Sequence, residues 1–289
     1  MRQFSGTGVA LVTPFNQDGS IDFDGLKNLL DFTAQGVDFF VVMGTTGESV
    51  TTSSKEKAEI LDFVKSNNSK GLPIVYGIGG NDTLQVVKTI EESNLEGVDA
   101  ILSVSPYYNK PSQAGIIAHF EYIADRAPVP IILYNVPGRT MSNMTAKTTI
   151  QLSKHPNIIG IKEASHDLDQ CNEIIQGMSD DFFLTSGEDL ITTDIVEMGG
   201  VGVISVLANG FPVEFSDIAK YALAGDFKKS FENTDAFKEI NPLMYLESNP
   251  VGVKEVLRQK GVCSGYVRLP LLDATEELSV SIKAHLNEI

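Results

Sequence analysis

Lys162 is the residue whose type and position point most directly to chemistry. It closes a short apolar run, residues 158–161, which lies between Pro156-Asn157 and Ser165. A β-branched run bounded by turn residues is typical of a buried parallel strand. A lysine at the carboxyl end of such a strand lies where α/β barrels carry their active sites. Desolvation disfavours the ammonium form, and a neutral amine is the nucleophile that forms a Schiff base with a carbonyl compound.

Hydroxyl-bearing and cationic side chains follow the other apolar runs of the chain. They are Thr45, Thr46, Tyr107, Tyr108, Tyr134 and Arg139. A tyrosine hydroxyl can shuttle the protons of imine formation, and a threonine between two tyrosines would extend the relay. The Thr45-Thr46 turn suits one carboxylate, and the guanidinium of Arg139 suits a second. The pattern predicts two anionic, carbonyl-bearing reactants around one amine.

Each of these residues also has a purely structural interpretation. Lys162 could reach solvent or pair with Glu163. Tyr134 could be an ordinary core tyrosine, and Arg139 could anchor a loop. The threonines could simply satisfy the backbone of a turn. Their common position at the ends of strands favours the catalytic interpretation.

Competing sites are less consistent with the sequence. The four histidines, His119, His155, His166 and His285, fall in expected helices or connecting loops, so no histidine cluster is expected at the strand ends and no metal site is predicted. The loop 77–82 has Asp82 where a dinucleotide-binding loop needs its last glycine, and residues 44–49 lack the lysine of a phosphate-binding loop.

Composition limits the classes of partner. The chain has 289 residues, a 42% apolar fraction and a formal net charge of −16. This acidity argues against nucleic acid and anionic membrane surfaces as partners. No apolar stretch approaches the ~20 residues of a membrane span, and no signal peptide is expected. The two cysteines, Cys171 and Cys263, show no disulfide or metal spacing, which indicates a reduced, cytoplasmic setting.

Strand and helix patterns alternate along most of the chain. Strands are expected at 8–13, 39–44, 74–79, 100–105, 131–136, 158–162, 182–186 and 202–206. Helices are expected at 21–35, 53–67, 84–95, 114–127, 145–153, 167–176, 190–198 and 212–224. Eight such units predict an α/β fold, a closed (β/α)8 TIM barrel over residues 1–225. Further helices at 227–240, 250–260 and 274–287 predict a small C-terminal helical region over residues 226–289.

Four segments, 44–49, 107–111, 134–140 and 160–163, resemble the dihydrodipicolinate synthase (4-hydroxy-tetrahydrodipicolinate synthase) family of the pyruvate-dependent class I aldolase superfamily. The resemblance extends over essentially the whole chain. It implies a lyase of lysine and diaminopimelate biosynthesis that condenses pyruvate with aspartate 4-semialdehyde. It implies no cofactor other than the covalent imine, and a homotetramer built as a dimer of dimers.

The resemblance also implies a role for each site residue. Lys162 would form the imine and Tyr134 would be the general acid/base, with Thr46 and Tyr108 completing the relay. Thr45 and Thr46 would hold the pyruvate carboxylate, and Arg139 would bind the carboxylate of the semialdehyde. Gly187 and Ile204 would offer backbone contacts. Tyr107 would reach across the dimer interface.

One region departs from the family pattern. Lysine-inhibited members carry two histidines and a glutamate at positions that correspond here to Ser54, Lys57 and Gln85. Losing an acid and gaining a cation would repel a cationic effector, so weak or absent lysine feedback is expected.

Two other functions remain open at this point. An N-acetylneuraminate lyase or sugar-acid aldolase would use the same imine with a neutral polyol acceptor, which would not require Arg139. A barrel that binds a keto acid without turnover would form no covalent adduct.

Overall fold

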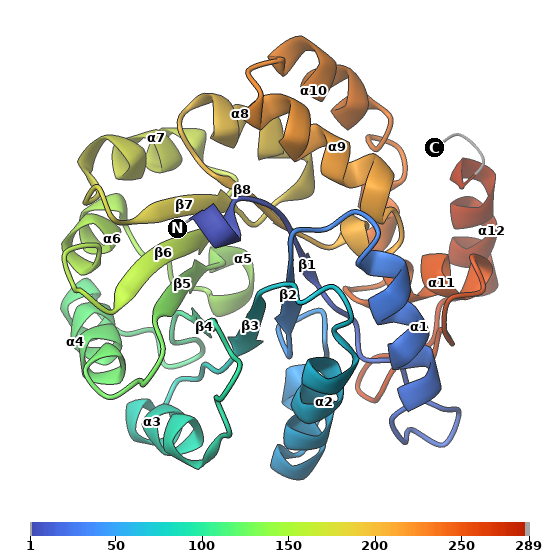
Figure 1. Ribbon diagram of the computed structural model, residues 1–289, viewed down its shortest axis with the longest axis horizontal. Coiled ribbons are helices and arrows are strands. Elements are labelled where there is room, and N and C mark those ends of the chain that lie inside the picture. The colour runs from blue at the N-terminus through green and yellow to red at the C-terminus, as the bar shows by residue number, and fades with distance from the viewer. Residues whose placement is uncertain (1, 287–289) are drawn as a thin grey trace.

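Eight parallel strands close into a barrel, as Figure 1 shows. The computed structural model describes residues 2–286. The strands are β1 Gly6–Ala10, β2 Phe39–Val42, β3 Ile74–Gly77, β4 Ala100–Val104, β5 Ile131–Asn135, β6 Ile158–Glu163, β7 Phe183–Ser186 and β8 Gly202–Ser205. Each strand pairs with the next, and β8 pairs with β1. The predicted (β/α)8 barrel is therefore confirmed.

Helices surround the barrel in the order that the sequence predicts. They are α1 Phe23–Thr33, α2 Ser54–Asn67, α3 Thr83–Glu92, α4 Gln113–Ala124, α6 Ala146–Leu152, α7 Leu168–Gly177, α8 Thr192–Glu197 and α9 Pro212–Leu223. Local sequence explains their starts. Ser53, for example, forms a capping box with Glu56 at the start of α2. A short extra helix, α5 Pro137–Thr140, follows β5 and was not predicted.

Three helices beyond the barrel form the small C-terminal helical region: α10 Phe227–Asp235, α11 Val251–Gln259 and α12 Glu276–His285. The helix expected at 227–240 ends at Asp235, and a separate 3₁₀ turn, Asn241–Met244, follows. The helix expected at 190–198 is divided into the 3₁₀ turn Asp189–Ile191 and α8. The last residue of the helix expected at 274–287, Asn287, lies outside the described residues.

The core has two layers because strand side chains alternate between the two faces of the barrel wall. One layer, which includes Phe39, Ile132 and Phe183, fills the barrel interior, and Phe4 from an N-terminal 3₁₀ turn packs against Phe39 at a 5.6 Å ring separation. The larger layer lies between strands and helices. Gly160 leaves room for Phe183, whose ring would lie 2.5 Å from a Cβ at that position. The barrel interior is therefore packed with side chains and is not a channel.

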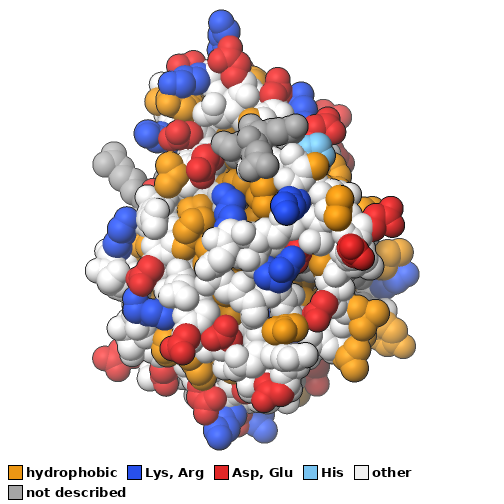
Figure 2. All heavy atoms as spheres, turned by 90° about the vertical axis from the view of Figure 1, so that its right-hand side faces the viewer, with side chains coloured by type: hydrophobic (Ala, Val, Ile, Leu, Met, Phe, Trp, Pro, Cys, Tyr) orange, Lys and Arg blue, Asp and Glu red, His pale blue; other side chains and the backbone are white. Residues whose placement is uncertain are grey.

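In Figure 1, α10 lies at the top, where it contacts α8 and α9, and α11 and α12 lie together at the right. Seen from that side, acidic and basic side chains are interspersed over the surface, as Figure 2 shows. None of the helices within residues 2–286 combines the length and the apolar character that crossing a membrane requires.

Candidate active site

Lys162 lies on the inner face of β6, where its side chain is 6% exposed. Its Nζ atom is 4.7 Å from the centre of the Tyr134 ring, and Tyr134 is its partner in the β5–β6 register. Within residues 2–286 the ammonium forms no hydrogen bond and no ion pair. The two structural interpretations of Lys162, that it reaches solvent or that it pairs with Glu163, are therefore wrong. Glu163 faces the opposite side of the wall, as alternation along a strand requires.

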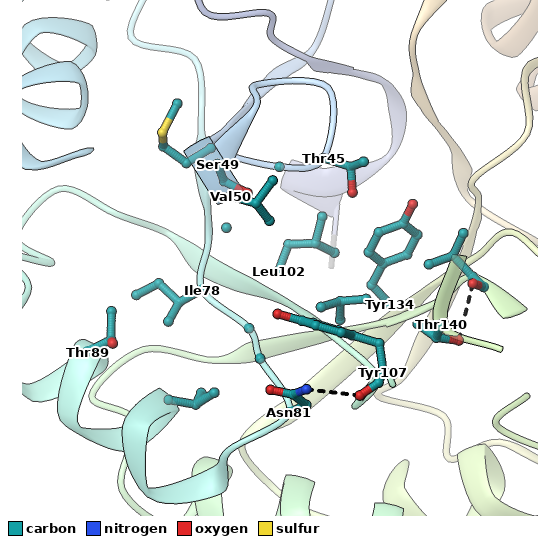
Figure 3. Close-up of a pocket in the computed structure, with 18 of the residues that line it drawn as sticks. Thr45, Ser49, Val50, Ile78, Asn81, Thr89, Leu102, Tyr107, Tyr134 and Thr140 are labelled. Carbon is teal, nitrogen blue, oxygen red and sulfur yellow. Dashed lines mark hydrogen bonds between the residues drawn. The ribbon is translucent and has the colours of Figure 1, made fainter. Parts of the chain in front are cut away.

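A cavity of about 620 Å³ opens at the carboxyl ends of the strands, with Tyr134, but not Lys162, on its wall. Thr45, Tyr107, Tyr134 and Arg139 all contribute to its wall. Figure 3 shows the hydroxyl groups of Thr45 and Tyr134 turned towards the same space, with the Tyr107 ring beside them. These groups come from the ends of three strands, β2, β4 and β5, so the predicted convergence at one mouth is found in the structure.

The two consecutive threonines lie differently from the relay that was expected. Thr46 is 3% exposed, and its Oγ1 accepts a 3.0 Å hydrogen bond from Asn249 Nδ2. Thr45 is exposed and lines the cavity. The structure therefore places Thr45, and not Thr46, on the cavity wall, and the relay role of Thr46 stays a prediction. Once β2 has ended, the turn and not strand alternation decides that Thr45 faces Tyr134.

The two consecutive tyrosines also lie differently from one another. Tyr108 has a positive φ of 69° and is 88% exposed, so its ring points away from the cavity of its own chain. Tyr107 lines the cavity, and its carbonyl accepts a 3.1 Å hydrogen bond from Asn81 Nδ2. Tyr108 is thus the more exposed of the two, and a contact of Tyr107 across a dimer interface stays a prediction.

Three further predicted residues lie at or near the cavity. Arg139 is exposed on α5 and lines the cavity. Gly187 follows β7, and a Cβ there would lie 2.6 Å from Ala164 Cβ and 3.0 Å from Lys162 Cε, so a side chain at this position would collide with β6 and its loop. Ile204 is buried on β8 in the interior layer that also contains Tyr134.

Two acids after β7 face the cations of the site. Burial raises the pKa of Glu188, an effect that the charges of His166, Lys162 and Arg139 oppose. Burial also raises the pKa of Asp189 to about 6, although its Oδ2 accepts hydrogen bonds from the backbone of Val206 and Leu207. Sequence reasoning gave neither acid a role.

One histidine does reach this end of the barrel. The Nε2 atom of His166, in the loop after β6, lies 3.2 Å from Glu188 Oε1. His166 lies in a connecting loop, as expected, and has a positive φ of 60°. No group of three His, Cys, Asp or Glu side chains that could hold a metal ion is found in the described part of the chain.

The C-terminal region supplies contacts that sequence reasoning missed. Besides the bond from Asn249 to Thr46, Lys254 Nζ lies 2.5 Å from Glu48 Oε1 and donates to the Tyr266 carbonyl at 2.7 Å. Both charged side chains are almost fully buried. These contacts join α11 and the segment before it to the turn after β2. The two contacts to that turn each span more than 200 positions and have no local signal.

The fold and the site together define a class: a (β/α)8 barrel with a candidate Schiff-base lysine among hydroxyl groups at the carboxyl ends of its strands. The model of the dihydrodipicolinate synthetase family matches residues 3–289. The chain belongs to this family. A relative from Cytophaga hutchinsonii, named 4-hydroxy-tetrahydrodipicolinate synthase, is 50% identical over 99% of this chain and 97% of its own length.

Solved structures agree with this assignment. The dihydrodipicolinate synthase of Acinetobacter baumannii, described as chloride-inhibited and complexed with pyruvate, matches with a TM-score of 0.95 and 33% identity over 98% of both chains. The DHDPS of Cyanidioschyzon merolae with lysine bound matches with a TM-score of 0.94 and 36% identity, over 99% of this chain and 98% of the other. The sugar-acid aldolase alternative is not favoured by these relatives.

Proposed function

We propose that this chain is a 4-hydroxy-tetrahydrodipicolinate synthase, which condenses pyruvate with L-aspartate 4-semialdehyde through an imine on Lys162 in diaminopimelate and lysine biosynthesis. The observation that carries the proposal is a buried lysine, 4.7 Å from the Tyr134 ring, whose side chain forms no salt bridge within residues 2–286. The shared name of the relatives and the pyruvate complex of one of them support the choice of reaction.

The chemistry proceeds in four steps. The amine nitrogen of Lys162 adds to the carbonyl carbon of pyruvate, and the carbinolamine loses its hydroxyl as water to give the imine. Tyr134 supplies the proton for that water and then accepts a proton from the pyruvate methyl group, which leaves an enamine. The enamine carbon attacks the aldehyde. Finally, the amino group of the second reactant displaces Lys162, which closes the ring and releases the enzyme amine.

The relay in this proposal uses the hydroxyls that face the cavity. Thr45 adjoins Tyr134 there, and its turn holds the pyruvate carboxylate together with the backbone of Thr46. Because Tyr108 is exposed, it joins the relay only when a second copy brings it over the neighbouring cavity. We therefore propose that the protein works as a tight dimer and, as the family resemblance implies, that two such dimers form a homotetramer.

The imine performs the activation that a cofactor would otherwise supply, so we propose that neither a cofactor nor a metal ion takes part. We also propose a cytoplasmic location. Two free cysteines, one of them buried, are consistent with that setting.

Turnover with two acceptors tests the proposed function. Pyruvate and aspartate 4-semialdehyde should give the heterocyclic product, whereas pyruvate and N-acetylmannosamine should give none. Activity with the sugar alone would instead make the protein a sugar-acid aldolase. A protein that gains no pyruvyl adduct on borohydride reduction would be a binding barrel and not an enzyme.

Replacing Arg139 with alanine should impair the reaction of the semialdehyde but not imine formation with pyruvate. Arg139 lies on the cavity wall and forms no ion pair within residues 2–286, so its guanidinium is free to bind the semialdehyde carboxylate. The loss of a charge-assisted hydrogen bond should lower kcat/KM for the semialdehyde on the order of 10- to 100-fold. The rate of imine formation with pyruvate alone should stay within about twofold of the native rate.

The matched control is Arg126→Ala, because Arg126 stacks over Tyr122, 3.5 Å from its ring centre, outside the cavity. Its kinetics should be native. Unchanged semialdehyde kinetics in Arg139→Ala would remove Arg139 from the binding site.

Free lysine should inhibit this protein weakly or not at all. Lys57 and Gln85 line the cavity together with Ser49, Asn81 and Tyr107, while Ser54 is exposed and does not. Burial lowers the pKa of the Lys57 amine, and no acid in the described part of the chain pairs with it, so a cationic effector would meet an uncompensated cation. Initial rates at millimolar L-lysine should equal those without it.

The reciprocal variant Lys57→Gln/Gln85→Glu removes the cation and adds an acid at the same wall. It should gain lysine binding, measured by calorimetry, and inhibition should follow. Strong inhibition of the native protein by submillimolar lysine would contradict the argument.

A further inference from the structure

A network of buried polar side chains lies behind the barrel wall, where β5 and β6 end. Its two central members are Asn135 and Glu163, which directly follow Tyr134 and Lys162 in their strands. Because side chains alternate, Tyr134 and Lys162 face the barrel interior, whereas Asn135 and Glu163 face the helices. Asn135 and Glu163 are also partners in the strand register, and Asn135 Nδ2 lies 3.0 Å from both carboxylate oxygens.

Glu163 is a buried carboxyl group whose hydrogen-bond partners are donors, with no cation in the described part of the chain paired with it. Its side chain is 1% exposed, and it forms no ion pair with any residue from 2 to 286. Ser165 N donates to Oε1 at 2.9 Å, and Gln170 Nε2 donates to Oε2 at 3.1 Å. Burial raises the pKa of Glu163, and the bonds from Asn135, Ser165 and Gln170 oppose that rise. These partners of the carboxylate are all donors, so they fit an acceptor at position 163.

The network continues to the loop that carries Arg139. Asn135 Oδ1 accepts a 3.0 Å hydrogen bond from Met144 N, and Asn135 Nδ2 donates to Asn143 Oδ1 at 2.8 Å. Asn143 Nδ2 in turn donates to Gln170 Oε1 at 2.8 Å. Residues 143 and 144 lie a few positions after α5, the helix of Arg139. One connected network therefore fixes the backbone next to three groups of the site.

The cost of such a network indicates what it does. Burying an uncompensated carboxylate and several amides is less favourable than filling the same space with apolar side chains. The polar network instead fixes the orientation of the groups that it joins, because its hydrogen bonds are all satisfied in one arrangement only. A direct amide–carboxylate link between two strand ends fixes the spacing of the inward-facing residues beside it.

We propose that Asn135 and Glu163 are positioning residues, which hold Tyr134 and Lys162 in the register that imine formation requires. The inference rests on the proposed function, because it assumes that Lys162 is the nucleophile. Catalytic steps are sensitive to misplacement on the scale of 1 Å, so loss of this link slows the chemistry even when the barrel stays folded.

Two isosteric single variants test this proposal. Glu163→Gln places an amide donor against other donors, and Asn135→Asp places two carboxylates side by side. For each variant, the single-turnover rate of imine formation with pyruvate should fall on the order of 10- to 100-fold at a temperature at which circular dichroism shows a folded protein. Thr193→Val is the matched control, because it breaks a buried hydroxyl cluster with Ser230, remote from β5 and β6.

The double variant Asn135→Asp/Glu163→Gln reverses the polarity of the network without changing its shape. The amide introduced at position 163 and the amides of Asn143 and Gln170 can then each turn over to match an acceptor at position 135. The double variant should recover the rate of imine formation to within about fivefold of native.

The outcomes separate the alternatives. If folded single variants form the imine at the native rate and lose only thermal stability, as Thr193→Val should, the two residues are structural and the proposal is wrong. A double variant slower than both single variants would also overturn it. If the single variants do not fold, Gln170→Leu decides, because Gln170 is only partly buried. It should slow imine formation about fivefold, and a native rate would reject the proposal. Absence of an imine in the native protein would instead contradict the proposed function.

Discussion

Lys162→Ala is expected to abolish covalent capture of pyruvate and to lower turnover by on the order of 10⁴-fold or more. Among the described residues, only Lys162 has its amine over the Tyr134 ring, so nothing replaces the lost nucleophile. The measurement is borohydride reduction in the presence of pyruvate, followed by intact-mass analysis. The native protein should gain one reduced pyruvyl group, and the variant should gain none.

Lys254 provides an internal control for this experiment. It is more deeply buried than Lys162, at 0% exposure, but it is paired with Glu48. Burial lowers the pKa of Lys254, and the charge of Glu48 opposes this effect. Peptide mapping should therefore locate the adduct at Lys162 and leave Lys254 unmodified. An adduct that persists in Lys162→Ala, or that maps to Lys254, would show that the nucleophile is misassigned.

Lys254→Met should have the largest effect on stability, a loss of about 3–5 kcal/mol in the free energy of unfolding. The substitution leaves the Glu48 carboxylate buried without its counter-ion, although Arg268 N still donates to it at 3.0 Å. Glu48 directly follows the Thr45-Thr46-Gly47 turn and has a positive φ of 53°. The turn that faces Tyr134 should therefore lose order along with stability, and activity should fall even at denaturant concentrations too low to unfold the protein. Denaturant unfolding and initial rates measure the two effects.

A double-mutant cycle distinguishes loss of the ion pair from loss of packing. Glu48→Gln keeps the acceptor for Arg268 N and removes the charge. Lys254→Met/Glu48→Gln should then recover at least half of the stability that Lys254→Met loses. Purely additive effects would mean that the lysine contributes through its apolar stem alone.

The sequence was sufficient to predict the barrel and the strand ends that hold the site. The reason is that alternation within a buried strand fixes which side chains face inwards, so Lys162 and Tyr134 follow from the pattern. Arg139 follows from the rule that residues after parallel strands converge. The barrel was confirmed, and the cavity wall contains Thr45, Tyr107, Tyr134 and Arg139.

The alternation of side chains between two faces ends where a strand ends. The positions that the sequence did not predict lie beyond that point. The sequence could not show that Thr45 rather than Thr46 lines the cavity, or that Tyr108 points outwards. The direction of each side chain depends on turn geometry, such as the positive φ of Tyr108. The contacts of Asn249 and Lys254 were missed for a different reason. They depend on how the C-terminal region folds back over the barrel, which no local pattern encodes.

The hydrogen bond between Thr46 and Asn249 joins residues 203 positions apart, and the Glu48–Lys254 pair joins residues 206 apart. At the ~5–20 residues per second of protein synthesis, Thr46 emerges roughly 10–40 s before its partner is made. Throughout that interval Glu48 lacks the lysine that pairs with it in the folded protein. A chain that ended before residue 249 would thus contain Lys162 but would lack Asn249 and Lys254, which hold the turn after β2.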